Sequence, residues 1–356
     1  MKILQVIPYF CFGGAETMCE NLTYALKKQG HEVVVVSLYA ERTPISERME
    51  QAGVKIRYLD KKLGLDVSMV SKLTKIMKAE RPDVVHTHLD VIKYAVAAAK
   101  LAGVRKCVHT VHSVAHKEAE GRIQKIINTL YYKLGWSVPI ALSAEVQDTI
   151  VDFYGLKKEA VPVIRNGVDL SKCLVKESYR LHTPVKLLHV GRFDVPKNHA
   201  GLLRAFQKLL EACPDCQLEL VGDGDLRPQI EQLIEDLGIR DRVVLHGMQS
   251  NVHPYLQDAD MFVLPSTYEG NPMTIIEAMG TGLPIVATRV GGIPDMVRDG
   301  ETALLVPCEE EAVRKACETL ITDEALRESL GTRAKQDSVR FSAEFMAAKY
   351  CEIYGK

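Results

Sequence analysis

The sequence predicts an α/β fold made of two Rossmann-like domains, each built on a parallel sheet. Its 356 residues exceed the size of one ordinary hydrophobic core. Short apolar runs rich in β-branched residues alternate with segments of helical periodicity, which is typical of doubly wound sheets. The alternation starts again after a loop around residues 171–184, so each half predicts a sheet of its own.

The helices expected between the strands end at ordinary stop signals. The helical stretch 15–29 ends before Gly30, the stretch 67–79 ends ahead of Pro82, and a stretch over 342–354 closes the chain. Ligands of such sheets bind beyond the carboxyl ends of the strands, so the residues after each strand are candidates for a site. The predicted strands are 2–7, 32–38, 54–59, 83–88, 106–111, 139–143, 185–190, 216–221, 242–247, 260–265, 283–288 and 302–306.

Charge is distributed unevenly between the halves of the chain. Residues 1–175 hold 25 Lys and Arg against 18 Asp and Glu, whereas residues 176–356 hold 20 against 28. A basic half is suited to an anionic acceptor or an anionic membrane surface. Lys and Arg are not clustered densely enough for a nucleic-acid platform, so nucleic acid is not expected as a partner.

The cysteines indicate a reducing compartment. There are nine, an odd number without regular spacing, which favours free thiols over disulfides. Cys213 and Cys216 have no second pair that would complete a metal site, so ordinary thiols are expected there too. Neither an export signal nor a run of ~18 uncharged residues is visible. We therefore expect a cytoplasmic protein, in solution or at the inner membrane surface.

A glycine pair follows the first predicted strand. Gly13 and Gly14 would let the backbone approach a ligand closely, and the next helix offers N–H groups to an anion. A tight turn that requires glycine is an equally good explanation. The GxGxxG fingerprint of nicotinamide-binding proteins is absent here.

Two cations follow the first strand of the second half. Gly191 ends this strand, and Arg192 and Lys197 flank the start of the next helix. An arginine fork, a lysine point charge and the positive end of a helix together suit a diphosphate. Two solvated surface cations are the alternative.

Two carboxylates, Glu269 and Glu277, lie in a loop and in the helix expected to begin near Asn271. Carboxylates accept hydrogen bonds from vicinal hydroxyls, which suits Glu277 to a ribose and Glu269 to a transferred sugar. A glutamate inside the apolar run IIEAM is otherwise an expensive placement.

Together these motifs resemble one family. The runs GRFDVPKN, VGDGDL and YEGNPMTIIEAMGTGLPIVAT, with GGAE, TVHS and RNGVD, are similar to the retaining glycosyltransferases of family 4, which have the GT-B fold. The likeness covers nearly the whole chain. It implies an acceptor domain over residues 1–168 and a donor domain over residues 169–341, facing each other across a cleft. A final helix, 342–356, would cross back to the first domain.

The resemblance also implies roles for individual residues. Arg192 and Lys197 would bind the donor diphosphate, Glu277 the ribose, and Glu269 the sugar being transferred. His112, in TVHS, would polarise that sugar through a hydrogen bond; a core histidine is the alternative from the sequence alone. The other implied donor-binding positions are Gly13, Gly14, Gly191, Asn271, Met273 and Thr274, of which the first two would lie against the phosphates or the acceptor.

The activity implied is transfer of a hexose or N-acetylhexosamine from a nucleotide-diphosphate sugar to a saccharide or lipid-linked acceptor. The anomeric configuration would be retained, in polysaccharide or glycolipid assembly, with no cofactor, metal or enzyme nucleophile. Catalysis would rest on positioning and on stabilising the departing diphosphate. A nucleotide-sugar epimerase of the same fold and an inactive sugar-binding partner subunit are the alternatives.

Two further patterns invite a metal interpretation. Asp258 and Asp260 form a DxD, but it leads into a strand instead of following one, so a helix-to-strand connection is expected. Histidines i and i+2 on a strand share a face without supplying a third ligand. These histidines, to which we assign no catalysis, are His86, His88, His109 and His116.

Residues 121–136 combine an apolar stripe with basic flanks. Two interpretations stay open: a domain helix that buries the stripe, and an amphipathic helix that lies in an anionic membrane surface. The stripe is Ile123, Ile126, Ile127, Leu130 and Leu134, and the flanking cations are Arg122, Lys125 and Lys133.

Overall fold

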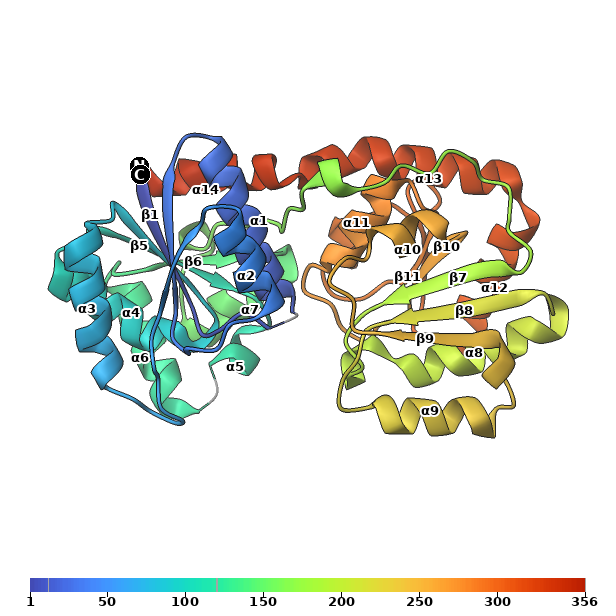
Figure 1. Cartoon of the computed structure of the whole chain (residues 1–356), viewed down its shortest axis with the longest axis horizontal. Coiled ribbons are helices and arrows are strands. Elements are labelled where there is room, and N and C mark those ends of the chain that lie inside the picture. Colours follow the sequence, from blue (N-terminus) through green and yellow to red (C-terminus); the bar gives the residue numbers. More distant parts are fainter. Residues whose placement is uncertain (12, 120, 356) are drawn as a thin grey trace. The chain divides into compact units, whose positions relative to one another are not determined.

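The computed structural model describes residues 1–11, 13–119 and 121–355. Its contacts divide the chain into two compact units. Unit 1 comprises Met1–Gly167 and Ala343–Lys356, and unit 2 comprises Val168–Ser342. In each unit, helices lie on both faces of one sheet (Figure 1).

Unit 1 is a six-stranded parallel sheet in the order β3-β2-β1-β4-β5-β6. In the centre of the sheet, Gln5 lies beside Val35 on one side and His86 on the other. The strands are β1 (Lys2–Ile7), β2 (Glu32–Ser37), β3 (Lys55–Tyr58), β4 (Val84–His88), β5 (Lys106–Val111) and β6 (Val138–Ala141). The α-helices are α1 (Gly14–Lys28), α2 (Pro44–Gln51), α3 (Ser68–Glu80), α4 (Ile92–Ala102), α5 (Ala115–Glu118), α6 (Arg122–Lys133), α7 (Ala144–Tyr154) and α14 (Ala343–Tyr354).

Unit 2 repeats this topology, in the order β12-β11-β10-β7-β8-β9. Its strands are β7 (Val185–Val190), β8 (Cys216–Val221), β9 (Val243–Gly247), β10 (Met261–Leu264), β11 (Ile285–Thr288) and β12 (Leu304–Val306). Its α-helices are α8 (His199–Ala212), α9 (Arg227–Asp236), α10 (His253–Asp258), α11 (Met273–Thr281), α12 (Glu310–Thr322) and α13 (Glu324–Ser338). Numbered within its own unit, each sheet runs 3-2-1-4-5-6, the order of a doubly wound fold. The predicted fold class is confirmed.

Most of the strands are buried on both faces, which explains why they read as nearly continuous apolar runs. In β2, for example, Val33, Val34, Val35 and Val36 are all at most 5% exposed. In β10, all four residues are fully buried. Helices α3 and α4 cover the sheet of unit 1, and α8 and α12 cover that of unit 2.

Helix α14 packs into unit 1, although it follows unit 2 in the sequence. Tyr354 Oη lies 2.7 Å from His86 Nδ1, and Tyr350 Oη lies 2.7 Å from Thr110 Oγ1. Both tyrosine side chains are buried, so this last helix contributes to the core of the first sheet. None of the described helices combines the length and the apolarity that crossing a bilayer requires.

Candidate functional site

The first part of the site is the loop after β7. It continues into a short 3₁₀ turn, Val195–Lys197, and α8 then begins behind Asn198, whose side chain accepts the Gly201 N–H. Arg192 is exposed, and no described residue forms a hydrogen bond or an ion pair with its guanidinium. Its guanidinium therefore remains available to an anion.

Lys197 is instead paired. Its ammonium lies 2.6 Å from Glu269 Oε1, and Ser266 Oγ donates to the same oxygen at 2.7 Å. Glu269 is buried and Lys197 is 19% exposed in its side chain. The other carboxylate oxygen, Glu269 Oε2, has no hydrogen-bond partner among the described residues. Oε2 can thus accept from a ligand while Oε1 stays anchored.

The backbone of the Glu269 loop rests on a glycine turn after β11. Gly292 N–H donates to the Glu269 carbonyl at 2.9 Å. Gly291 has φ +55°, and a Cβ there would lie 1.8 Å from the same carbonyl oxygen. Only glycine fits this position. Ser266 and Gly291 were missed by the sequence analysis, although a glycine pair directly after a strand is the signal that marked Gly13 and Gly14.

Residues 271–274 lie at the start of α11. This helix begins at Met273, close to the predicted start near Asn271, and Pro272 is its N-cap residue with an extended backbone. No side chain caps this helix, and its first N–H groups remain available to a ligand. Asn271 and Met273 are buried, and Thr274 Oγ1 is a buried hydroxyl oxygen without a partner among the described residues.

Glu277 lies one turn further along α11. It is partly buried, and its carboxylate forms no hydrogen bond with any described residue. Burial raises the pKa of Glu277 to about 7, and the positive charge of Lys172 offsets this only in part. Hydrogen bonds donated by ligand hydroxyls would stabilise the ionised form of this carboxylate.

Gly191 brings the β7 and β8 loops together. A Cβ at Gly191 would lie 3.0 Å from His189 Nε2 and 3.3 Å from Lys197 Cδ. At the neighbouring loop, a Cβ on Gly222 would lie 1.9 Å from the Gly191 carbonyl oxygen. Gly222 therefore has to be glycine, whereas a Cβ at Gly191 would only press against two side chains. Unit 2 gathers Gly191, Arg192, Lys197 and Glu269 around two strand ends.

The glycine pair of unit 1 lies at the start of α1. Gly13 is the N-cap residue, with an extended backbone, and Gly14 is exposed with nothing within 4 Å of where a Cβ would stand. The carboxylate of Glu16 lies within the first turn and is buried. Because Glu16 already places a negative charge at the positive end of α1, a second anion is disfavoured there.

His112 follows β5 and is partly exposed. Its backbone N–H donates to Glu118 Oε2 at 2.6 Å, and its Nε2 lies 3.1 Å from His88 Nδ1. Burial lowers the pKa of His112 to about 4, and the charge of Glu118 opposes this shift. His112 is therefore neutral at pH 7.

The two aspartates that invited a metal interpretation have protein partners. Asp260 accepts the His182 and Lys186 backbone N–H groups, the latter at 2.8 Å, and Asp258 pairs with Lys186 Nζ at 2.5 Å. Within the described ranges, no three His, Cys, Asp or Glu side chains gather as metal ligands, and the thiols of Cys213 and Cys216 are free. The requirement for no metal stays a prediction.

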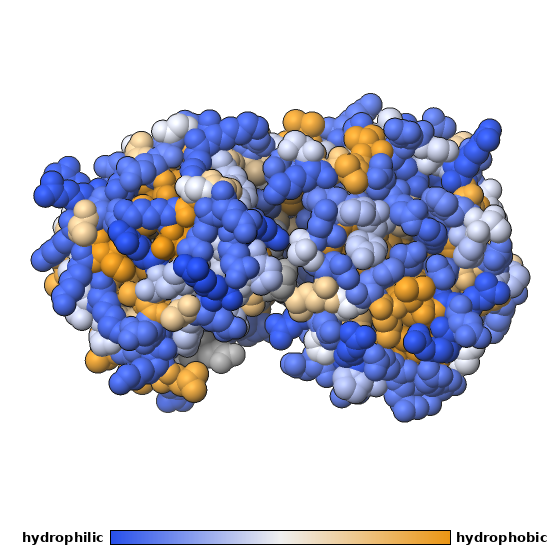
Figure 2. Space-filling view, viewed as in Figure 1, coloured by the Kyte–Doolittle hydropathy of each residue, from blue (hydrophilic) through white to orange (hydrophobic). Residues whose placement is uncertain are grey.

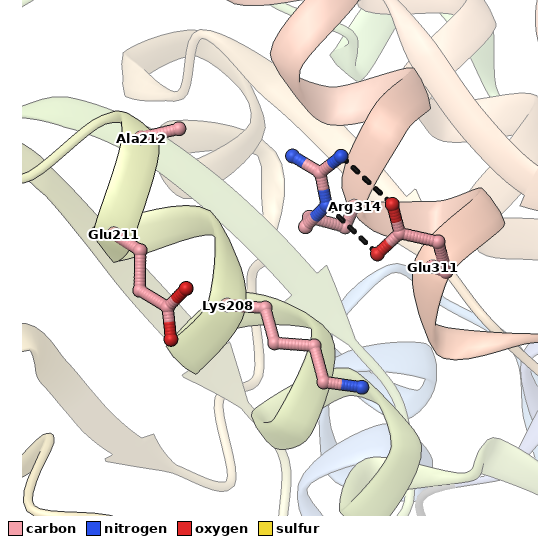
Figure 3. A pocket seen from close by; sticks show the side chains of 5 residues that line it. All are labelled: Lys208, Glu211, Ala212, Glu311 and Arg314. Atoms are coloured by element: carbon pink, nitrogen blue, oxygen red, sulfur yellow. Dashed lines mark hydrogen bonds and ion pairs between the residues drawn. The ribbon is translucent and has the colours of Figure 1, made fainter.

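A surface hollow in unit 2 lies apart from these residues. Figure 3 shows Lys208, Glu211 and Ala212 of α8 on one side and Glu311 and Arg314 of α12 on the other. Arg314 holds both oxygens of Glu311 at 2.8 and 2.9 Å. Since no predicted site residue lines it, this hollow is not the candidate site.

Most of the apolar stripe in residues 121–136 faces outward. Ile123, Ile126, Leu130 and Leu134 are each at least 51% exposed. The fifth member, Ile127, is partly buried and packs against the core of unit 1, and α6 buries Asn128, Tyr131 and Tyr132. The interpretation that a domain helix buries this stripe is therefore wrong for four of its five residues.

Two doubly wound units with a cationic, hydroxyl-accepting site at the strand ends define a nucleotide-binding α/β enzyme. The family model described as "Glycosyl transferases group 1" matches residues 175–337, and the model described as "Glycosyltransferase Family 4" matches residues 12–172. The chain belongs to this family of retaining glycosyltransferases, which confirms the prediction made from its motifs.

Relatives and a solved structure are similar over nearly the whole chain. N-acetyl-alpha-D-glucosaminyl L-malate synthase of Bacillus anthracis is 29% identical, covering 99% of this chain and 97% of its own length. The lipopolysaccharide core biosynthesis glycosyltransferase LpsE of Rhizobium meliloti is 27% identical, covering 96% and 95%. The crystal structure of Anabaena HepE in complex with UDP-glucose has a TM-score of 0.86 at 21% identity, covering 100% and 99%. This likeness supports the GT-B fold.

Proposed function

We propose that the chain transfers a hexose or N-acetylhexosamine from a nucleoside-diphosphate sugar to a saccharide or lipid-linked acceptor. One observation carries the proposal. Lys197 donates to Glu269 Oε1 at 2.6 Å, and the same loop carries Arg192, whose guanidinium has no partner among the described residues. Two cations and an anchored carboxylate suit a ligand that joins a diphosphate to a polyol.

In this proposal, each part of the donor has its own contacts. Arg192 and Lys197 bind the diphosphate and stabilise the charge that it gains as it leaves. Glu269 Oε2 and the start of α11 orient the transferred sugar. Glu277, whose carboxylate has no hydrogen-bond partner among the described residues, accepts from the ribose hydroxyls.

Unit 1 supplies the acceptor side in this proposal. His112 contributes a hydrogen bond to the transferred sugar. Glu16 leaves the start of α1 better suited to a neutral, hydroxyl-bearing group than to phosphate. Of the two roles left open for Gly13 and Gly14, we therefore favour contact with a saccharide acceptor.

An anionic lipid surface is the proposed partner of α6. The helix exposes its apolar stripe and carries Arg122, Lys125 and Lys133 without any acidic residue. A second exposed apolar segment precedes α3, with Leu63 93% exposed and Leu65 75% exposed. Such a surface suits contact with a lipid-linked acceptor, and positive charge favours anionic headgroups.

Both apolar segments flank the same part of α4. Asp66 N–H donates to Tyr94 Oη at 3.1 Å, and Tyr131 Oη donates to the Lys93 carbonyl at 3.3 Å. The α6 helix and the segment before α3 lie at the same end of unit 1 in Figure 1, and Figure 2 shows apolar side chains exposed there. They can therefore contact one surface together.

A thermal-shift screen of nucleoside diphosphates and their sugars tests the donor assignment. A ligand at 100 times its Kd raises stability by about 2.7 kcal/mol. We expect UDP and one UDP-sugar to stabilise the protein and the UDP-sugar to be slowly hydrolysed to free sugar and UDP. Release of an epimerised sugar would favour an epimerase, and binding without any turnover would favour an inactive partner subunit.

A further inference from the structure

A chain of hydrogen bonds runs from α1 to His112 inside unit 1. Thr23 Oγ1 lies 2.7 Å from the Cys19 carbonyl oxygen, and Gln5 Nε2 lies 2.6 Å from Thr23 Oγ1. Gln5 Oε1 lies 2.9 Å from His88 Nε2, and His88 Nδ1 lies 3.1 Å from His112 Nε2. Only His112, at the end of this chain, is partly exposed.

The direction of every bond follows from the first one. A carbonyl oxygen can only accept, so the single proton of the Thr23 hydroxyl is donated to Cys19. Thr23 Oγ1 must then accept from the amide nitrogen of Gln5. This fixes the Gln5 amide with Nε2 toward α1 and Oε1 toward His88.

The two histidines continue in the same direction. Gln5 Oε1 only accepts, so His88 carries its proton on Nε2. Burial holds the pKa of His88 well below its usual value, so the ring is neutral and Nδ1 keeps a lone pair. His88 Nδ1 therefore accepts a proton donated by His112 Nε2.

We propose that Gln5 and His88 hold His112 as the Nε2–H tautomer, so that its Nδ1 recognises a ligand group that donates a hydrogen bond, such as a sugar hydroxyl. Within residues 1–11, 13–119 and 121–355, no group pairs with this Nδ1. A carboxylate, phosphate or carbonyl oxygen would meet it lone pair against lone pair. Gln5, His88 and Thr23 are positioning residues, since they act through His112.

The identification of the recognised group as a sugar hydroxyl rests on the proposed transferase function, whereas the assignment of the His112 tautomer does not. The tautomer is measured on the free, full-length protein labelled with 15N-histidine, by two-bond 1H–15N correlation at pH 7. The His112 signals are those lost in His112→Asn. We expect a protonated Nε2 and an unprotonated Nδ1, and the opposite tautomer or an imidazolium would overturn the proposal.

Two matched substitutions test whether the relay sets this tautomer. Gln5→Leu removes both polar atoms from the chain, so we expect the Nδ1–H tautomer of His112 to appear alongside the first. Gln147→Leu is the control, because Gln147 donates to the Val161 carbonyl at 2.7 Å, outside the relay. If His112 kept a single, unchanged tautomer in Gln5→Leu, the role of Gln5 would be overturned. If that variant does not fold, the wild-type spectrum still decides which tautomer His112 adopts.

Ligand recognition is tested on the wild type. The probes are UDP-glucose, UDP-galactose and UDP-N-acetylglucosamine, and the one that saturates the protein is used, with UDP alone as the control. A sugar hydroxyl that donates to His112 Nδ1 should shift the 15N resonance of this nitrogen toward the chemical shift of a protonated nitrogen. We expect this shift with the UDP-sugar and not with UDP. If the UDP-sugar saturated the protein without such a shift, the proposal that Nδ1 recognises a sugar hydroxyl would be rejected. The measured tautomer and the transferase assay would be unaffected.

Discussion

Lys197 Nζ lies 2.6 Å from Glu269 Oε1, although the two side chains belong to segments 72 residues apart and are assigned to different parts of one donor. The lysine proposed to bind the diphosphate thus pairs with the carboxylate proposed to bind the sugar. Arg192, five residues earlier, pairs with neither. The two cations of this site should therefore respond differently to substitution.

Lys197→Met should reduce both donor binding and stability. It leaves the buried Glu269 carboxylate without its cation, at a cost of about 1–3 kcal/mol, since Lys197 is partly exposed. Arg192→Ala should weaken UDP binding by about 10-fold or more while leaving the free energy of unfolding unchanged. Calorimetry with UDP and chemical denaturation measure the two quantities. Equal stability losses in both variants would contradict the ion pair.

Glu269→Gln should separate turnover from nucleotide affinity. A contact that orients the sugar acts mainly as charge develops at its anomeric carbon, so kcat should fall by about 10- to 100-fold. Affinity for UDP should stay equal or rise, because Lys197 loses its competing carboxylate. The measurements are steady-state kinetics and calorimetry with UDP. Loss of UDP binding would reassign Glu269 to the nucleotide.

Glu277→Gln should show the reverse pattern: it should weaken the binding of UDP and raise the KM for the donor. A ribose contact exists equally in the ground state and the transition state, so kcat should change little. Because the pKa of Glu277 is raised to about 7, hydroxyl donors that favour the ionised form should release a proton on binding. Calorimetry at pH 7 in buffers of different ionisation enthalpy measures that proton. Binding without proton release would place the ribose elsewhere.

The same pKa predicts how stability depends on pH. The carboxyl of Glu277 is protonated more readily in the folded chain than in the unfolded one, so its contribution is full below about pH 4.5 and is lost as pH rises to about 7. Above pH 7, Glu277→Gln should be more stable than the wild type by about 2–3 kcal/mol. At pH 4.5 the difference should disappear. Denaturation curves at several pH values give both quantities, and a gain that does not depend on pH would point to another cause.

Gly291→Ala should displace the Glu269 loop. The new Cβ would lie 1.8 Å from the Glu269 carbonyl oxygen, so the loop must move, at a cost of about 2–4 kcal/mol together with most of the turnover. Gly300→Ala is the matched control, because Gly300 has φ +70° and open space around its Cβ position. It should cost about 1 kcal/mol and leave kcat unchanged. Similar kinetics in the two variants would exclude a role for the Gly291 contact.

Periodicity and strand-end position were enough to predict the sheets and to mark Arg192, Lys197 and both glutamates. They could not predict that Ser266 and Lys197 share one oxygen of Glu269, because this contact depends on how two strand ends meet. Sequence separation hides such contacts even where each of the residues is a predicted site residue.

The α6 helix illustrates a different limit. Its spacing predicts an amphipathic helix, but periodicity alone does not say which face the domain covers. Here the aromatic and amide side chains of Tyr131, Tyr132 and Asn128 pack inward, with Asn128 Nδ2 donating to Tyr154 Oη at 3.2 Å. The more apolar stripe is consequently left outside.

The outward stripe should bind anionic vesicles. We expect the wild type to co-sediment at low salt with vesicles containing phosphatidylglycerol and not with pure phosphatidylcholine, because each basic residue near an anionic surface contributes about 1 kcal/mol. Ile126→Glu combined with Leu130→Glu should abolish co-sedimentation and leave UDP binding intact, since both side chains are more than half exposed. Val339→Glu, a change at a similarly exposed residue of unit 2, is the control. If the wild type did not bind the vesicles, the proposed lipid partner would be rejected. If the double variant still bound them, the membrane-binding surface would lie elsewhere than on α6.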